Sequence, residues 1–300
     1  METLRPKHIL VPTDFSDTAT VALEHAASLA THFGSHLSVL YADTFLPPID
    51  AAAVPAFPYA SEIDERVRAA EARLAEYAKK HLPSGLDCDV RVAVDSPVEA
   101  ILAYTAEAGI DWIVMGTHGR SGFRRMILGS VTEAVIRKSD RPVLAVRESE
   151  KAGGGYQRIL CPVVYSEEAR VAAEYAAVLA SKMDGLVTYL LIIDADEEPA
   201  PLVGELDRLR GWVPEKARDN AMYKELTLSR KRNESIIEFA RKHRSDLVVI
   251  GASQGRFTEE TVFGTTPDDI TRHAGCPVLV VNQKCVSAVE PAPAQMPYRS

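Results

Sequence analysis

The chain has 300 residues, of which 46% are hydrophobic and 25% charged, enough for two domains with buried cores. Its formal net charge of -8 argues against a general nucleic-acid binder, because such proteins need surplus lysine and arginine to displace counterions from phosphates. The segment METLRPKHILVPTDF lacks the apolar core of a signal peptide, and no apolar run reaches the roughly 18 residues of a membrane helix. We therefore expect a cytoplasmic protein that binds neither nucleic acid nor membrane.

In the first half of the chain, apolar runs alternate with helical patterns. Runs rich in Val, Ile and Leu predict strands at 8–12, 37–42, 89–94, 110–115 and 142–146. Apolar residues at helical spacing predict helices at 16–32, 61–82, 97–108 and 130–139, with Ser16 and Ser130 as N-cap residues. This alternation predicts a parallel sheet covered by helices on both faces, an open α/β sandwich.

Three segments of the first half recur in the second half. The pairs are HILVPTDFS at 8–16 with RILCPVVYS at 158–166, DWIVMG at 111–116 with DLVVIG at 246–251, and RPVLAV at 141–146 with CPVLVV at 276–281. The offset falls from 150 residues to 135, so the first copy carries about fifteen additional residues, which we place between 44 and 81. The chain is therefore two copies of one α/β unit.

The repeats also divide the chain. We predict a first domain at 1–147, a polar, glycine-rich linker at 148–157, a second domain at 158–285 and a flexible tail at 286–300. The second copy has no clear counterpart of the long charged helix of the first, because the corresponding stretch, ELDRLRGWVPEKARDN, contains a glycine and a proline.

The segment GTHGRSGFRRMILGS at 116–130 links a predicted strand to a predicted helix and is rich in glycine and arginine. Its glycines at 116, 119 and 129 can take positive φ and let backbone N–H groups come close to a ligand. The following helix adds unpaired N–H groups and the positive end of its dipole. Parallel sheets bind ligands at such loops, beyond the carboxyl ends of their strands, so the segment is predicted to bind phosphate.

The spacing Gly116-xx-Gly119-x9-Gly129-Ser130, with VPTD at 11–14 and MGTHGR at 115–120, resembles the nucleotide signature of the universal stress protein family. The resemblance extends over both copies. It implies two Rossmann-like domains, similar to adenine nucleotide alpha hydrolases, that pair through their last strands as an intramolecular pseudo-dimer. It leaves open whether the two-domain chain forms a homodimer.

The resemblance further implies an ATP site in the first copy, with Mg²⁺ or Mn²⁺ bound through the phosphates. Asp14 would hold the adenosine end, the backbone of Ala42 would contact adenine, and the loop and helix start would surround the phosphates. For His118 two readings stay open, donation to phosphate or exposure to solvent. The residues assigned to ATP are Pro12, Thr13, Asp14, Ala42, Met115, Gly116, His118, Gly119, Arg120, Gly129, Ser130, Val131 and Thr132.

The second copy departs from this pattern where ligand contacts are expected. Val164 stands where the first copy has Asp14, so the adenosine carboxylate is missing. Two glutamates at 259–260 replace the two arginines at 124–125 and would repel a triphosphate. We therefore expect one nucleotide site per chain, in the first half.

Alternative functions stay open at this point. The first is a stress-response or signalling protein whose bound ATP sets its conformation or its protein partner. The second is an adaptor of the same fold that binds protein partners without nucleotide. A third is a slow ATPase, for which the sequence offers no committed base beyond the arginine-rich loop and His118.

Overall fold

The computed structural model describes residues 4–44, 57–118, 128–147, 155–163, 166–194, 202–228, 232–252, 266–282 and 285. The predicted tail and the predicted linker up to residue 154 lie outside these ranges. The first half contains β1 His8–Pro12, α1 Asp17–Phe33, β2 His36–Asp43, α2 Phe57–His81, β3 Cys88–Val94, α3 Pro97–Glu107, β4 Trp112–Gly116, α4 Ser130–Lys138 and β5 Val143–Val146. The second half contains β6 Arg158–Val163, α5 Glu167–Met183, β7 Leu186–Asp194, α6 Leu202–Trp212, a 3-10 helix Glu215–Asn220, β8 Ala221–Leu228, α7 Arg232–Lys242, β9 Leu247–Ala252, α8 Thr266–His273 and β10 Val278–Asn282.

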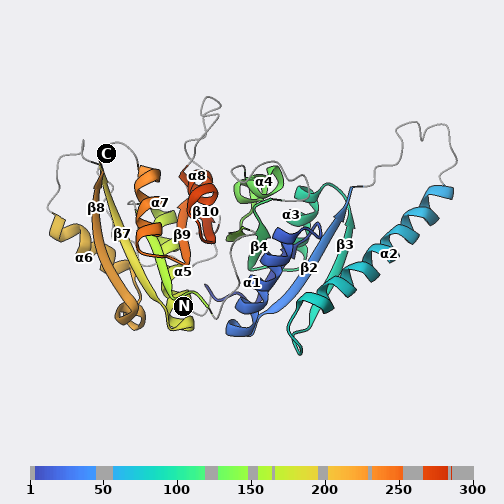
Figure 1. Ribbon diagram of the computed structural model, residues 1–300, viewed down its shortest axis with the longest axis horizontal. Coiled ribbons are helices and arrows are strands. Elements are labelled where there is room, and N and C mark those ends of the chain that lie inside the picture. Colours follow the sequence, from blue (N-terminus) through green and yellow to red (C-terminus); the bar gives the residue numbers. More distant parts are fainter. Residues whose placement is uncertain are drawn as a thin grey trace, which may run out of the picture.

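These strands form one continuous sheet of ten, in the order β3-β2-β1-β4-β5-β10-β9-β6-β7-β8 (Figure 1). Neighbouring strands are parallel within each half, as predicted. The halves join through the antiparallel pair of β5 and β10, in which Leu144 stands opposite Leu279. The predicted pseudo-dimer through the last strands is therefore confirmed.

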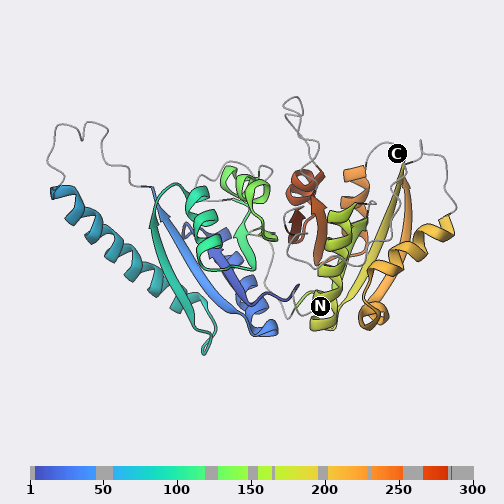
Figure 2. The ribbon, with the colours of Figure 1, turned by 180° about the vertical axis from the view of Figure 1, so that it is seen from behind.

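The helices cover both faces of this sheet, and the two halves lie side by side along it (Figure 2). Helices α1, α2, α5 and α6 contribute to the buried cluster on one face. Helices α3, α4, α7 and α8 contribute to the cluster on the other face. In the first half the connections change face after β3, so the neighbouring strands β1 and β4 continue into helices on opposite faces. Their carboxyl ends form the topological switch point.

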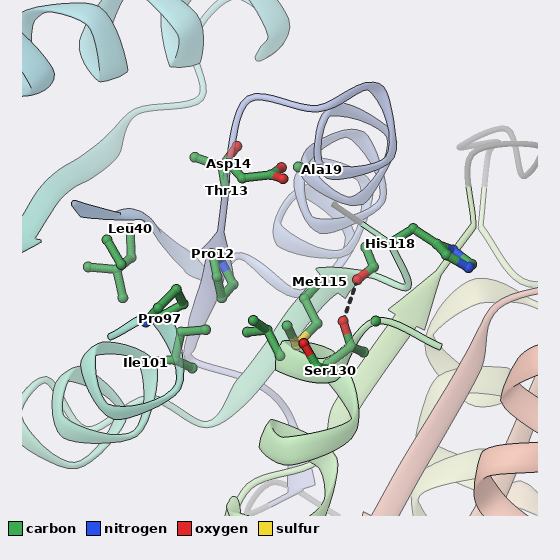
Figure 3. Close-up of a pocket in the computed structure, with 15 residues that line it drawn as sticks. Pro12, Thr13, Asp14, Ala19, Leu40, Pro97, Ile101, Met115, His118 and Ser130 are labelled. Carbon is green, nitrogen blue, oxygen red and sulfur yellow. Dashed lines mark hydrogen bonds between the residues drawn. The ribbon is translucent and has the colours of Figure 1, made fainter. Parts of the chain in front are cut away.

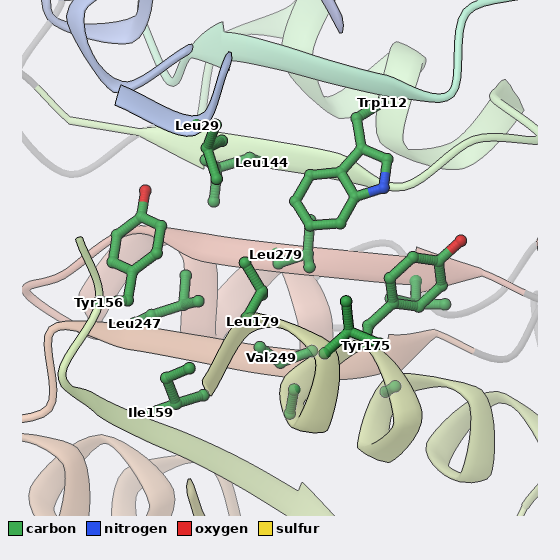
Figure 4. Close-up of a cluster of buried hydrophobic side chains, with 14 of the residues drawn as sticks. Leu29, Trp112, Leu144, Tyr156, Ile159, Tyr175, Leu179, Leu247, Val249 and Leu279 are labelled. Atoms are coloured by element: carbon green, nitrogen blue, oxygen red, sulfur yellow. The ribbon is translucent and has the colours of Figure 1, made fainter. Parts of the chain in front are cut away.

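The buried core is continuous between the halves (Figure 4). Trp112 of β4 is 1% exposed and packs edge-on against Tyr175 of α5, with ring centroids 5.6 Å apart. The Nδ1 atom of His25 in α1 lies 2.9 Å from the hydroxyl of Tyr156, just before β6. The two halves thus share apolar burial as well as a sheet.

The halves differ most in the helix after their second strand. Helix α2 has 25 residues and begins earlier than predicted, at Phe57. Helix α6 has 11 residues and ends at Trp212, before the 3-10 helix. The predictions of extra residues between 44 and 81, and of a broken counterpart, are confirmed. Figure 1 shows α2 running outward past β3.

Two further local predictions are wrong. Gly129 is the N-cap of α4, with extended backbone, and Ser130 is the first helical residue. Strand β4 begins at Trp112, two positions later than predicted, and the carboxylate of Asp111 just before it accepts the backbone N–H of His8 at the start of β1, at 2.9 Å.

Candidate functional site

A cavity of about 260 Å³ lies at the switch point, at the carboxyl ends of β1, β2 and β4 (Figure 3). The residues that line it are Pro12, Thr13, Asp14, Ala19, Leu40, Ala42, Pro97, Ile101, Met115, Gly116, His118, Gly129, Ser130, Val131 and Thr132. Every predicted site residue within the described ranges is among them. Gly119 and Arg120 lie outside the described residues.

The cavity also has four lining residues that were not predicted from the sequence: Ala19, Leu40, Pro97 and Ile101. Leu40 lies two positions before Ala42 on β2, and alternation along a strand places both on one face, so this signal could have found it. Pro97 and Ile101 are one turn apart at the start of α3. Their spacing predicts a shared face, but only the tertiary structure turns that face toward the cavity.

One side of the cavity is apolar. Leu40, Ile101 and Met115 are at most 4% exposed and belong to the buried cluster beneath α3 and α4. In Figure 3, Pro97 and Ile101 lie together on the side opposite His118. Apolar walls of this kind suit a flat aromatic ring that has to leave water.

The start of α4 forms the polar side. Its N-cap, Gly129, gives no side-chain hydrogen bond to the first turn, and the first N–H groups of a helix have no partner within it. The N–H groups of Ser130, Val131 and Thr132 therefore stand at the positive end of the helix dipole, worth roughly 0.3–1 kcal/mol per anionic contact. The Thr132 hydroxyl donates to the carbonyl of Gly116 at 2.7 Å (dashed in Figure 3), so this side chain fastens α4 to β4.

Gly129 allows a close backbone approach. It donates its N–H to the carbonyl of Thr117 at 2.7 Å, and a Cβ at this position would lie 3.0 Å from the same oxygen. Its φ is -62°, and Gly116 is absent from the described residues with positive φ. Neither glycine uses its freedom to adopt positive φ, and it is the close approach of neighbouring atoms that leaves no room for a Cβ at either position.

The turn between β1 and α1 holds Asp14. Its Oδ1 accepts the N–H of Ser16 at 3.0 Å, and the Thr13 hydroxyl accepts the N–H of Phe15 at 3.0 Å. Between these bonds Phe15 has a φ of 63°, in the left-handed region that residues with a Cβ seldom adopt. Ser16 caps α1, as predicted, by accepting the N–H of Ala19. Asp14 thus both shapes the helix start and lines the cavity.

His118 lies half-buried just after β4, and its Nδ1 is 2.9 Å from the Thr117 hydroxyl. Among the described residues of the cavity lining, it and Asp14 are the two titratable side chains. Within the described ranges, no group of three or more His, Cys, Asp or Glu side chains could hold a metal ion. Binding of Mg²⁺ or Mn²⁺ through phosphates stays a prediction.

One protein family matches this chain in both halves. The sequence model of the Universal stress protein family matches residues 6–147 and 155–282. A universal stress protein of Methanocaldococcus jannaschii is 32% identical over 153 residues, covering 47% of this chain and 94% of that protein. One of Mycobacterium tuberculosis is 31% identical over 147 residues, covering 48% of this chain and 45% of that protein.

The solved structures agree on the fold. The crystal structure of a universal stress protein from Archaeoglobus fulgidus has a TM-score of 0.70 and covers 92% of this chain and 98% of that one. Its 21% identity restricts this likeness to the fold. With one family matching twice over nearly the whole chain, and with the same α/β unit built twice into one sheet, the chain belongs to the universal stress protein family as a tandem of two domains.

Proposed function

We propose that this chain binds ATP in the cavity of its first half and acts as a stress-response or signalling protein whose conformation or protein partner depends on the nucleotide. The observation that carries the proposal is the convergence of the predicted residues on one cavity at the switch point. Residues from 12–14, 115–118 and 129–132 meet there although they are far apart in sequence.

The cavity favours one orientation of the nucleotide. The apolar wall of Leu40 and Ile101 suits adenine, and the Asp14 carboxylate can accept hydrogen bonds from ribose hydroxyls. The first turn of α4 suits the phosphates, because its N–H groups and dipole favour anions. Phosphates placed at Asp14 would instead meet a like charge. Mg²⁺ or Mn²⁺ would then be held by phosphate oxygens.

The lining is better suited to binding than to fast hydrolysis. Hydrolysis needs a positioned water, a base and charge neutralisation at the γ-phosphate. Of the two titratable residues in the described part of the lining, Asp14 is assigned to the adenosine end, which leaves His118. Any ATPase activity of this chain is therefore expected to be slow.

Location and assembly are further parts of the proposal. None of the described helices is both long and apolar enough to cross a bilayer. A cytoplasmic location and a homodimer of two-domain chains stay predictions, as does a protein partner.

Calorimetric titration of the purified chain with ATP and Mg²⁺ tests the proposal. We expect about one ATP per chain, and roughly tenfold or greater loss of affinity in Asp14→Ala, because the ribose hydroxyls lose their acceptor. Asp17→Ala is the matched control, since Asp17 is exposed in the first turn of α1. A universal stress protein has been solved in complex with cAMP, so cAMP is titrated in parallel. A wild type that binds neither nucleotide would favour the nucleotide-independent adaptor.

A further inference from the structure

We propose that Tyr77 and Arg73 of α2 are positioning residues for Asp14. They hold the strained turn at Phe15, and this turn directs the Asp14 carboxylate into the cavity. Both residues stand outside the cavity lining. The inference rests on the proposed nucleotide site and names the part of the chain that shapes its adenosine end.

The turn is strained at Phe15. A bulky residue with a φ of 63° is an outlier, because in the left-handed region its Cβ comes too close to backbone oxygen. Asp184, which also has positive φ, is the left-handed C-cap of α5, a common place for this conformation. Phe15 instead lies between a strand and a helix, next to Asp14. Such strain persists only where the surrounding structure holds it, and it gathers at ligand sites.

Side chains of β2 and α2 contact the ring of Phe15. The Tyr41 ring of β2 lies 4.9 Å away between centroids, and the Tyr77 ring lies 5.2 Å away, edge-on at 85°. The guanidinium of Arg73 lies over the Phe15 ring, with its Cζ 4.0 Å from the centroid. Edge-on aromatic and cation–π contacts are directional, so together they favour one position of the ring and stabilise the backbone that places it there.

Tyr77 also reaches Asp14 through hydrogen bonds. The Thr20 hydroxyl donates to the carbonyl of Ser16 at 3.1 Å, so it accepts from the Tyr77 hydroxyl, 2.9 Å away. Ser16 in turn gives its N–H to the Asp14 carboxylate. Burial raises the pKa of Tyr77, which keeps its hydroxyl protonated as this donor. A hydrogen-bonded path therefore runs from α2 to the carboxylate.

Helix α2, which supplies both Arg73 and Tyr77, is the element in which the two halves differ most. Arg73 and Tyr77 lie in the C-terminal part of the 25-residue α2, whereas α6 has only 11 residues. The half that has Asp14 thus has the long helix, and the half with Val164 at the matching position has the short one. This association is expected if one task of α2 is to direct the aspartate.

Binding of ATP, adenosine and inorganic tripolyphosphate to Tyr77→Phe and Arg73→Met tests the inference. Both variants are expected to lose affinity for ATP and for adenosine by the same factor, about three- to tenfold, with tripolyphosphate binding unchanged. If the two residues only stabilise the fold, both variants would lower the melting temperature without the difference between adenosine binding and tripolyphosphate binding. Arg68→Met is the control, because Arg68 is exposed and, among the described residues, donates to the backbone carbonyl of Asp64, one turn earlier in α2.

A double-mutant cycle makes the test decisive. In an Asp14→Ala background, Tyr77→Phe should cause no further loss of adenosine affinity, because no carboxylate is left to direct. An equal loss with and without Asp14, or no loss in a chain that binds ATP, would overturn the inference and leave the nucleotide site standing. A wild type that binds no ATP would overturn both.

Discussion

Gly116 in the first half and Gly251 in the second stand at matching positions near the ends of β4 and β9. In each half, an added Cβ would run into the first turn of the helix that follows the first strand. It would lie 2.8 Å from Cγ2 of Thr18 in the first half and 2.5 Å from the backbone carbon of Glu168 in the second. The second half has lost the aspartate but keeps this glycine. This position of the glycine-rich signature is therefore explained by the packing of the fold, with or without a ligand.

The largest effect is expected from Gly251→Ala. The new methyl group would meet backbone atoms of Glu168 and Ala169 at 2.5 to 2.7 Å, which cannot rotate away, so α5 has to shift. We expect the free energy of unfolding, measured in urea, to fall by about 2–4 kcal/mol. Gly116→Ala should cost less, because its nearest contact is a side-chain methyl group.

Gly204→Ala is the control for both variants. Nothing lies within 4 Å of a Cβ at Gly204 in α6, so the substitution should be neutral or stabilise by up to roughly 1 kcal/mol. If Gly251→Ala costs no more than Gly204→Ala, close packing does not explain the shared glycine.

A medium effect is expected from Asn282→Ala at the end of β10. The side chain of Asn282 is buried, and its Nδ2 donates to the carbonyls of Ile136 and Ser139 at the end of α4. The second half thus caps the helix whose start lines the cavity. Removing the amide leaves these carbonyls unsatisfied, with an expected loss of about 1–3 kcal/mol in urea unfolding and weaker ATP binding. Arg147 occupies the matching position in the first half.

Asn220→Ala is the control that separates a loss of stability from a loss of ATP affinity. The Nδ2 of Asn220 donates to the carbonyl of Gly185 at 2.8 Å, within the second half. We expect this variant to lose stability and to keep the ATP affinity of the wild type. If Asn282→Ala keeps it as well, α4 holds its position without help from the second half.

The smallest expected effect is a loss of stability at mildly acidic pH. His8 and Arg158 begin β1 and β6 at matching positions. Burial lowers the pKa of His8, and so does His36, whose ring centroid is 4.7 Å away. As the pH falls, the imidazole of His8 is therefore protonated at a higher pH in the unfolded chain than in the folded chain. The contribution of His8 to the free energy of unfolding is fully present above its ordinary pKa of 6.5, and it declines as the pH falls below that value.

Arg158 gives the second half no such sensitivity, because a guanidinium keeps its charge throughout this range. Urea unfolding between about pH 7.5 and 5.5 should show a shallower decline in His8→Gln than in the wild type. An unchanged decline would show that another group is responsible.

Much of this structure could be predicted because the signals are local. The strands are short runs of apolar residues separated by helical patterns, and the repeat extends this reading to the second half. The position of the cavity follows from strand–helix alternation, since Asp14 and Gly116 both lie at the carboxyl ends of strands in a parallel sheet.

The remaining details depend on contacts between distant segments. The N-cap of α4 is Gly129 and not Ser130 because Gly129 approaches the carbonyl of Thr117. The positive φ of Phe15 accompanies ring contacts with Tyr77, 62 positions away in the sequence. No propensity of either residue predicts such an arrangement.

Because β5 and β10 belong to one chain, their antiparallel pairing does not depend on the protein concentration. Between separate subunits, the same pairing would be a bimolecular equilibrium and would weaken as the protein becomes scarce. Within one chain, the linker keeps the two strands at a high effective concentration whatever the amount of protein. The cap that Asn282 places on α4 is then present at any expression level. Even a cell that holds few copies of this chain would thus contain the cavity with its α4 side capped.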